Sequence, residues 1–347
     1  MTQEKPKPPE KPKAEAPPPP SPIAGFQLGA LKPSAELKHG SPLVACRFDP
    51  SGKWVITASQ DNALQRWSLA DSKKTDMAGH SSWVRAMAFS TGGETLYSGG
   101  YDGTIIAWPL DAGQPEPIRQ ARAHDGWIRS MAFHGGKLLS GGNDGKVCLR
   151  NAATLAEERQ WLAHDCHVYQ VAFSPDGGKI LSADHKGRVK VWEPDGKLVR
   201  EFPIPGLHKY DTGFRADIGG VRSWSFSPDG PLVACAGITN VSNAFAGVGN
   251  PLIVIADWNA GKVVRELKPK EAFQGTMWGV AWNKAGFITG AAGGNGGMLW
   301  FWKPDQANEM FAHKLPENAR DMSQSADGGK IAVAYQGGTV RVYPLAG

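Results

Sequence analysis

The sequence predicts an all-β protein made of small antiparallel sheets arranged in a ring, and three observations lead to this prediction. Short runs such as WVRAMAF at 83–89 alternate between apolar and polar side chains, which is typical of strands with one buried face. The runs end at turns rich in Gly and Asp, and the chain has 43 Gly in its 347 residues. From Ile23 onward the pattern recurs at roughly 40–45 residues, the length of one four-stranded propeller blade.

The clearest copy of the pattern runs from His80 to Trp108 and contains three strand-like runs. They are WVRAMAF at 83–89, TLYSGG at 95–100 and TIIAW at 104–108. The turns STGG and YDG separate the runs, and Gly and Asp tolerate the backbone conformations that tight turns require. Each copy is therefore expected to form an antiparallel meander.

This copy carries His80, Ser98, Asp102 and Trp108, a set that resembles the signature of the WD-repeat family. The resemblance covers nearly everything after residue 22, and it implies that these side chains form a structural hydrogen-bonded tetrad within each blade. Corresponding residues in the other copies are His39, Thr57, Asp61 and Trp67; His124, Ser140 and Asp144, with Arg150 in the Trp position; and His164, Ser182 and Trp192, with Lys186 in the Asp position.

Three later copies keep the strand order but lose most of the tetrad. The fifth reads SWSFSPDG at 223–230 and IVIADW at 253–258, with either Ala256 or Trp258 in the Trp position. The sixth runs from GVAWN at 279–283 to LWFW at 299–302, and the seventh from about Asn318 to Tyr343, with Gly337 in the Asp position. The count predicts a seven-bladed β-propeller of four-stranded antiparallel blades.

The seventh copy lacks a fourth strand, because the chain stops just after its third strand. Residues about 24–38 precede the first His39 and are expected to supply this outer strand. Such closure places both ends of the chain in one blade and removes sheet edges that would otherwise pair with other chains.

Residues 1–22 contain nine Pro with Lys, Glu and Ala, and little that could be buried. They predict a disordered tail, so the propeller domain is expected to span 23–347. An alternative is that PPPPSP at 17–22 is a ligand for a proline-binding domain.

Composition narrows the classes of function. The net charge of +5 is too small to predict nucleic-acid binding. No apolar run reaches the ~18 residues of a membrane span, the first residues lack the apolar core of a signal peptide, and the four Cys show no paired spacing. We expect reduced thiols and a cytoplasmic protein. No phosphate-binding loop and no zinc spacing occurs, so the sequence predicts neither a cofactor nor a metal ion.

One column of equivalent positions carries the candidate binding residues. Two residues before the position of Met87, the seven copies read Val44, Arg85, Arg129, Tyr169, Arg222, Trp278 and Arg320. Matching positions of a propeller form a circle, so these side chains are expected at the mouth of the central channel. We call this rim, where the first strand of each copy begins, the top face. Neighbouring positions on the same rim add Trp83, Trp127, Tyr101, His167 and His185.

Arginine and aromatic side chains are the usual energetic anchors of protein interfaces. Guanidinium groups pair bidentately with carboxylates and phosphates. We therefore predict a non-catalytic interaction scaffold, a monomer within a larger complex, whose top face binds an acidic or phosphorylated peptide. Long segments at 203–219, 238–250 and 293–297 are expected on the same face and favour it as the functional one.

Three alternatives remain open. The arginines could pair with local acids such as Asp125, Asp165 or Asp321 and only brace the rim. The chain could be an enzyme, because other propeller families include hydrolases and lactonases and because His, Ser and Asp are the groups of a hydrolase triad. The propeller enzymes typically hold a metal ion at the channel, which arginines there would repel. Nucleic-acid binding by the arginines would show a steep dependence of affinity on salt.

Overall fold

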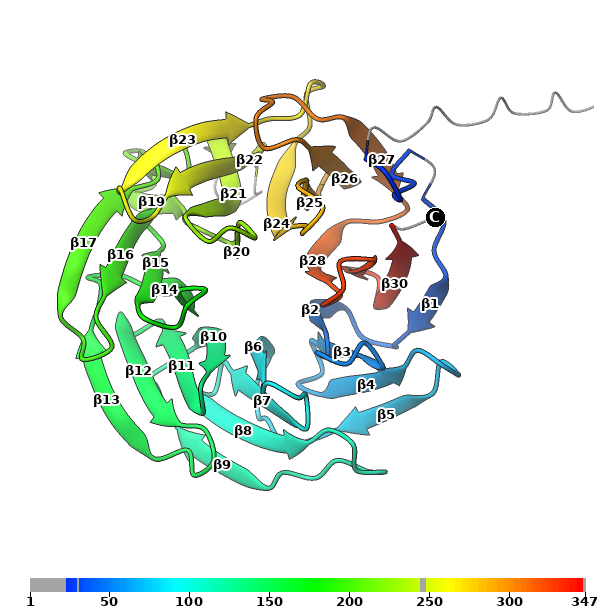
Figure 1. Ribbon diagram of the computed structural model, residues 1–347, viewed down its shortest axis with the longest axis vertical. Helices are drawn as coiled ribbons and strands as arrows, with labels where there is room; N and C mark the ends of the chain where they lie inside the picture. The colour runs from blue at the N-terminus through cyan, green and yellow to red at the C-terminus, as the bar shows by residue number, and fades with distance from the viewer. Residues whose placement is uncertain (1–22, 30, 244–247, 346–347) are drawn as a thin grey trace, which may run out of the picture.

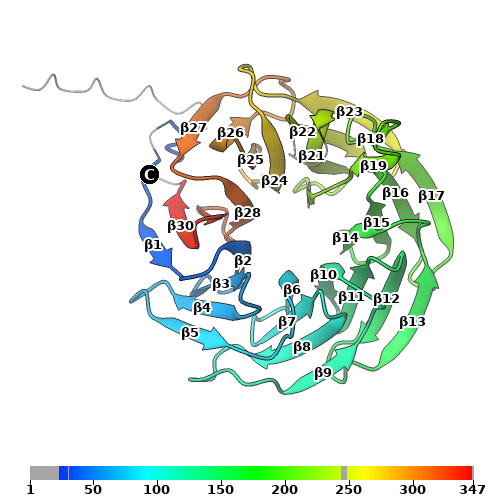
Figure 2. The same ribbon diagram turned by 180° about the vertical axis from the view of Figure 1, so that it is seen from behind.

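The computed structural model describes residues 23–29, 31–243 and 248–345, and the predicted tail over 1–22 lies outside them. Seven four-stranded antiparallel sheets form a ring (Figures 1 and 2), which confirms the predicted seven-bladed β-propeller. The described part of the chain contains no helix long and apolar enough to cross a membrane.

Each blade begins with an inner strand beside the axis of the ring and continues outward through three more strands. The inner strands are β2 (Leu43–Phe48), β6 (Val84–Phe89), β10 (Ile128–His134), β14 (Val168–Phe173), β20 (Ser223–Phe226), β24 (Gly275–Trp282) and β28 (Ala319–Gln324). The second strands are β3 (Trp54–Ser59), β7 (Thr95–Gly100), β11 (Lys137–Gly142), β15 (Ile180–Asp184), β21 (Leu232–Asn243), β25 (Ile288–Gly294) and β29 (Lys330–Tyr335).

The outer half of each blade completes the sheet. The third strands are β4 (Leu64–Ser68), β8 (Thr104–Pro109), β12 (Lys146–Asn151), β16 (Arg188–Trp192), β22 (Val248–Asp257), β26 (Gly296–Trp302) and β30 (Thr339–Pro344). The outer strands are β5 (Lys74–Met77), β9 (Arg119–Arg122), β13 (Glu157–Leu162), β17 (Leu198–Pro203), β23 (Lys262–Leu267), β27 (Phe311–Leu315) and β1 (Ala35–Lys38).

The ring closes through the first strand of the chain, as predicted. β1 pairs antiparallel with β30, from Ala35 opposite Val342 to Lys38 opposite Thr339. Leu37 is buried between the seventh and first blades, so the outer strand contributes to the core as well as to the sheet.

The hydrophobic core is divided into seven layers, one between each pair of neighbouring blades. Between the first and second blades, for example, Ile56 and Leu64 pack against Leu96 and Ile106. Each sheet is thus covered on both faces, and each fully buried Leu or Ile contributes about 1.5–3 kcal/mol. This packing between neighbouring blades keeps the inner strands in a ring around the central axis.

Polar side chains join the inner strands of neighbouring blades. The backbone N–H groups on an inner strand's free edge need acceptors because no further strand pairs there. Ser223 and Ser225 on β20 accept hydrogen bonds from the N–H groups of Val280 (3.2 Å) and Trp282 (2.9 Å) on β24. Asp321 accepts one from the N–H of Cys46 at 3.0 Å across the closure of the ring.

The tetrad of the second blade has the geometry that the resemblance implies. His80 bonds to Asp102 through Nδ1 (3.1 Å) and to the hydroxyl of Ser98 through Nε2 (2.8 Å). The indole N–H of Trp108 donates to the same hydroxyl at 2.8 Å. The chain of bonds links the loop that enters the blade to the second and third strands and to the turn between them.

The fourth blade corrects the expectation that Lys186 replaces the tetrad aspartate. Asp184, two residues earlier, bonds to His164 Nδ1 at 2.9 Å, while His164 Nε2 and Trp192 Nε1 meet the hydroxyl of Ser182 at 2.7 and 2.9 Å. The tetrad is therefore complete. Its carboxylate comes from the end of β15, where the other blades have Ser59, Gly100 and Gly142.

The first blade has all four residue types but different bonds. Trp67 donates to Thr57 at 2.9 Å, yet Gln65 accepts the hydroxyl of Thr57 and continues the chain to Ser59. Ser59 then bonds to Asp61, and Asp61 meets His39 through Nε2 at 2.6 Å. The expected direct bond between His39 and Thr57 is replaced because the Gln65 amide occupies the space between them.

The third and fifth blades show what happens without the tryptophan. Arg150 occupies its position and donates to the carbonyl groups of Leu155 (2.8 Å) and Arg122 (3.0 Å). In the fifth blade Ala256 pairs with Val233, which places Ala256 and not Trp258 in the tryptophan position. Trp258 instead donates to the carbonyl of Gly230 at 2.6 Å.

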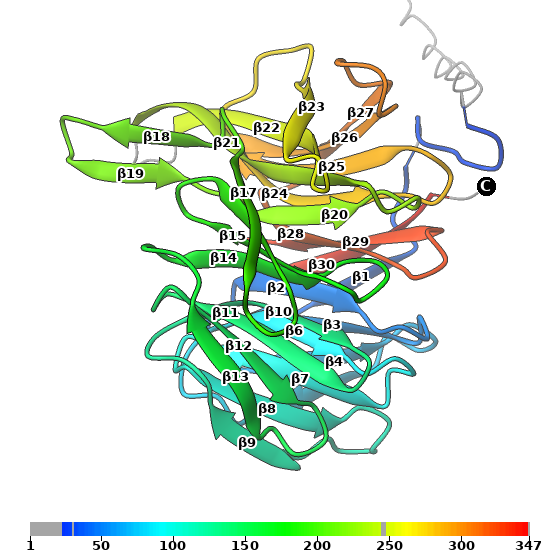
Figure 3. The same ribbon diagram turned by 60° about the vertical axis from the view of Figure 1, so that its left-hand side comes forward.

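The long segments on the top face are hairpins rather than loops. β18 (His208–Asp211) and β19 (Ala216–Gly219) form a separate two-stranded sheet that projects from one side of the ring (Figure 3). β21 and β22 extend beyond the usual blade length, and β25 and β26 continue to a turn at 294–296. The sequence indicated loops because these segments are longer than the usual turns between strands, whereas in the structure strand pairing continues into them.

Candidate functional site: the channel mouth on the top face

A β-bulge at the start of the inner strands positions the candidate residues. In six blades the register between inner and second strand shifts by one residue, and the residue without a partner belongs to the predicted column. These unpaired residues are Val44, Arg85, Arg129, Tyr169, Trp278 and Arg320. A bulge leaves its extra residue outside the ladder and turns its side chain away from the usual alternation. In the fifth blade Arg222 directly precedes β20.

The structure brings all seven column residues together around one cavity. The cavity has a volume of about 300 Å³. It is lined by Val44, Gln60, Trp83, Arg85, Tyr101, Arg129, Tyr169, Gln170, Arg222, Trp278 and Arg320. A second cavity of about 350 Å³ continues it into the channel and shares Arg85, Arg129, Gln170 and Arg222. The predicted circle of side chains is thus present, whereas its binding role stays a prediction.

The arginines and rings alternate around the mouth. Arg222 lies between Tyr169 and Trp278, with its guanidinium carbon 4.7 and 5.7 Å from the two ring centroids. The guanidinium carbons of Arg85 and Arg320 lie 5.7 and 5.9 Å from the centroid of the same Trp278 ring. These cation–π contacts hold the guanidinium groups in place without neutralising their charge.

Arg129 is enclosed by three rings. Its guanidinium carbon is 4.6 Å from Trp127, 4.8 Å from Tyr169 and 5.5 Å from Tyr101. Its Nε donates to the side-chain oxygen of Asn143 at 2.8 Å. The guanidinium group is therefore held by stacking and by the hydrogen bond of its Nε, which leaves its terminal nitrogens as donors for a ligand.

The acids that could have neutralised the mouth pair with other cations. Asp125 pairs with Arg122 at 3.3 Å, and Asp321 pairs with Arg47 lower in the channel. Among the described residues that line the mouth there is no carboxylate. This placement argues against the alternative in which the four arginines only brace the rim through local ion pairs.

The electrostatics of the mouth reflect this excess of positive charge. Burial, together with the charges of Arg222 and His167, lowers the pKa of His185 to about 4. Burial and the nearby charge of Arg129 also lower the pKa of His167. Both imidazoles are consequently neutral at pH 7, and they stack at 5.9 Å beside Tyr169.

Sequence reasoning missed Gln170, which lines both cavities. Its amide donates to the carbonyl of Arg222 at 2.7 Å and so links the fourth and fifth blades beneath the arginines. Gln170 follows the bulged Tyr169 directly. Strict alternation directs two successive residues to opposite faces of a sheet, so it does not predict that Tyr169 and Gln170 both line the cavity. Only a prediction of the bulge would have indicated Gln170.

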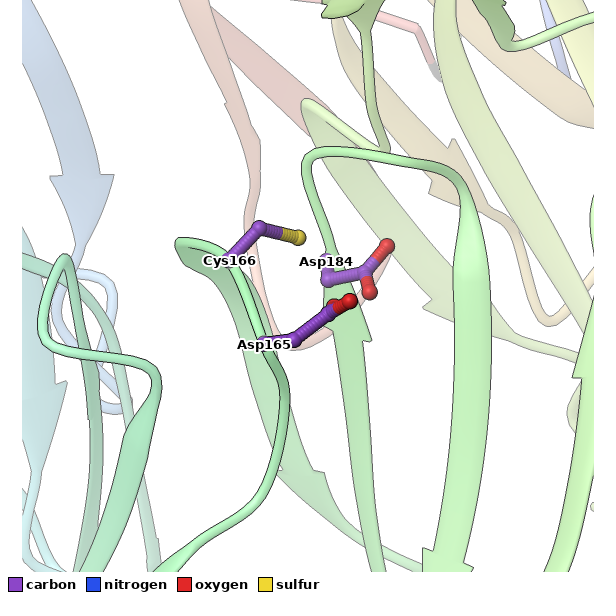
Figure 4. A group of neighbouring side chains, drawn as sticks. All are labelled: Asp165, Cys166 and Asp184. Carbon is purple, nitrogen blue, oxygen red and sulfur yellow. The ribbon is translucent and has the colours of Figure 1, made fainter.

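A cluster of Asp165, Cys166 and Asp184 brings three potential metal ligands within 4.8 Å of one another (Figure 4). Two cations already neutralise it. Arg188 donates to Asp165 and, at 2.9 Å, to Asp184, and Lys186 lies 3.5 Å from Asp165. Burial and the charge of Asp184 raise the pKa of the Cys166 thiol to about 11. The group is an ion-paired network with a protonated thiol, which does not suit a cation.

The Ser–His–Asp sets of the blades resemble a hydrolase triad in their distances but not in their access. His124 lies 2.9 Å from both Ser140 and Asp144, yet Ser140 is fully buried, as are Ser98 and Ser182. A hydroxyl nucleophile must reach its substrate. The burial favours a structural role for every tetrad.

Comparison with known proteins identifies the class to which this architecture belongs. Four consecutive segments match the repeat family described as "WD domain, G-beta repeat", namely residues 31–68, 72–109, 115–151 and 157–193. Each segment ends within one residue of the tetrad tryptophan position. With seven blades of four strands, the chain is a WD-repeat β-propeller.

Individual relatives match parts of the chain. DDB1- and CUL4-associated factor 5 from Homo sapiens is 34% identical over 137 residues, which cover 38% of this chain and 14% of that protein. WD repeat-containing protein SL1-17 from Schistosoma mansoni is 26% identical over 187 residues, or 53% and 58%. Apoptotic protease-activating factor 1 from Rattus norvegicus is 25% identical over 208 residues, or 59% and 16%. The chain spans less than two thirds of each relative's length.

Proposed function

We propose that this chain is a non-catalytic scaffold whose channel mouth binds an acidic or phosphorylated segment of a partner protein. The observation that carries the proposal is the set of four guanidinium groups around one cavity without a carboxylate among its described lining residues. Guanidinium groups bind carboxylates and phosphates through paired, charge-assisted hydrogen bonds. Like charges gathered at a concave mouth also attract anions from solution.

Two further observations support a protein partner in a reducing compartment. One relative is named for its association with two other proteins, DDB1 and CUL4. All four cysteines are free thiols, as suits the cytoplasm, where disulfides are rare. We expect the propeller to act as a single copy within a larger assembly, because each blade already has its neighbours within one chain.

Replacement of Arg85 and Arg129 together by Ala tests the site. Each charge-assisted hydrogen bond contributes about 1.5–3 kcal/mol, so we expect the Kd for a fluorescein-labelled phosphoserine peptide to rise at least about 100-fold. The measurement is fluorescence anisotropy, with thermal unfolding as the check that the double variant stays folded near the wild-type temperature.

The matched control is the double variant Arg119→Ala/Arg159→Ala. The two residues lie exposed on the outer strands β9 and β13, so the control loses the same two charges away from the mouth. Equal binding by wild type and Arg85→Ala/Arg129→Ala would contradict the assignment. A labelled single-stranded oligonucleotide at two salt concentrations completes the test, because tight and steeply salt-dependent oligonucleotide binding without peptide binding would favour nucleic acid as the ligand.

A further inference from the structure

Two exposed tryptophans lie beside the channel mouth. Of the tryptophans in the chain, all within the described residues, only Trp83 (39%) and Trp127 (41%) are exposed. Both flank Tyr101, whose ring is parallel to that of Trp127 at 4.0 Å and tilted against that of Trp83 at 6.2 Å. We call these three rings, Trp83, Tyr101 and Trp127, the aromatic terrace. Large exposed apolar side chains that gather in one place indicate an interaction surface.

The aromatic terrace is continuous with the arginines. Trp83 and Tyr101 line the same cavity as Arg85 and Arg129, and the Arg129 guanidinium is 4.6 Å from Trp127. An extended peptide advances about 3.3 Å per residue. A residue held by Arg129 therefore places the residues one or two positions away over the terrace.

The surroundings select the chemistry of the group that would cover the terrace. Arg129 already faces two of its rings, and Arg85 lies close by, so a cationic side chain would be repelled. The indole N–H of Trp83 donates to the carbonyl of Gln60 at 2.9 Å and is not available to a ligand. What remains for a ligand is the exposed ring surface of Trp83 and the part of Trp127 that Tyr101 and Arg129 leave uncovered.

A proline fits these requirements. Its ring packs on aromatic side chains, it has no backbone N–H that would need a partner, and its restricted φ lowers the entropy lost on binding. We propose that the aromatic terrace binds a proline of the partner segment, one or two residues from the anionic residue at the arginines. This inference rests on the proposed function of the channel mouth and adds the specificity of that site.

The test uses three synthetic fluorescein-labelled peptides that share one phosphoserine. In the first, glycines flank the phosphoserine; in the second and third, two prolines replace the glycines on its N-terminal or C-terminal side. We expect one of the proline peptides to bind wild-type protein at least about five-fold more tightly than the glycine peptide. The double variant Trp83→Ala/Trp127→Ala should reduce this ratio to about one.

Two further variants make the test specific. Trp83→Phe/Trp127→Phe keeps apolar rings and should retain most of the preference for proline, which guards against a general loss of structure at the rim. Val263→Ala/Val264→Ala changes exposed apolar residues on the outer strand β23 and should leave the ratio unchanged.

The possible failures are distinguishable. If the glycine and proline peptides bind wild type equally well, and both depend on Arg85 and Arg129, the terrace proposal is wrong while the proposed function stands. A preference for proline that persists in Trp83→Ala/Trp127→Ala would also overturn it. If none of the peptides binds, both the proposed function and the proposal built on it are overturned.

Discussion

At the scale of single residues, two tryptophans occupy the same position in different blades but have different hydrogen bonds. Trp108 and Trp302 are both fully buried in the third strand of their blades. Trp108 donates its indole N–H to Ser98, whereas the N–H of Trp302 has no partner among the residues that the structure describes, because Gly290 stands in the serine position. Both blades therefore bury the indole ring of the tryptophan, but only the second blade also has the hydrogen bond.

This difference can be measured with Trp→Phe substitutions. Trp108→Phe and Trp302→Phe remove similar apolar volume, but only the first breaks a buried hydrogen bond, which contributes about 1 kcal/mol. We expect Trp108→Phe to reduce the free energy of unfolding by about 1–2 kcal/mol more than Trp302→Phe does, as measured in urea. An equal loss in both variants would mean that the tetrad bond adds nothing to packing.

Residue identities predicted the tetrads better than their bonds. The sequence placed Lys186 in the aspartate position because it compared spacings, but Asp184 reaches His164 from two residues earlier. It also gave no sign that Gln65 would separate His39 from Thr57. Which side chains bond to each other depends on their lengths, whereas a repeat pattern gives only the position of each residue along the chain.

At the scale of elements, the β-bulges and the closing strand determine what the ring can do. In six blades a bulge aims one residue of the inner strand at the mouth, so that a column in the sequence becomes a circle of side chains. The sequence predicted this circle because equivalent residues share a register, even though it did not reveal the bulges. The extended pairing of β21 with β22 was not predicted, since the length of that segment indicated a loop.

The closing strand β1 provides a prediction at this scale. Leu37 is buried between the last and first blades, whereas Glu36 beside it forms a surface ion pair with Arg341 at 2.8 Å. Leu37→Ala should lower the free energy of unfolding by about 2–5 kcal/mol. Glu36→Ala on the same strand should lower it by less than about 1 kcal/mol. Comparable losses in chemical denaturation would show that closure through β1 contributes little to stability.

At the scale of the whole molecule, the positive mouth links stability to pH. The pKa of His185 is lowered to about 4 by burial and by the charges of Arg222 and His167, whereas an unfolded histidine titrates near about 6.5. The unfolded chain therefore takes up this proton first. The resulting contribution to stability is complete above about pH 6.5 and is lost as the pH falls through about 4.

The variant His185→Gln isolates this contribution. Between pH 6.5 and pH 4, wild type should lose more free energy of unfolding than His185→Gln does, as followed by urea denaturation at each pH. His134→Gln, at the exposed end of β10, is the control. A bound phosphoserine peptide should lessen the loss in wild type, because its charge opposes that of the arginines. Parallel curves for wild type and His185→Gln would contradict the assignment.

The number of blades was predictable from the sequence because the repeat period survives where the tetrad does not. The seventh blade shows this well, since Tyr335 and Tyr343 replace the tetrad there with a buried hydroxyl pair at 2.7 Å. The ligand of the mouth is less predictable, because a circle of charges indicates the sign of a partner and its geometry but not the partner's sequence.

The pairing of β1 with β30 also sets the order of assembly during synthesis. Of the described strands β1 is made first and β30 last, so the ring cannot close until the other blades have been made. Contacts between such distant segments form slowly, and unpaired sheet edges favour aggregation. A ribosome that stalls before β28 would release a row of blades with two uncovered ends, the form of this protein that is most exposed to aggregation.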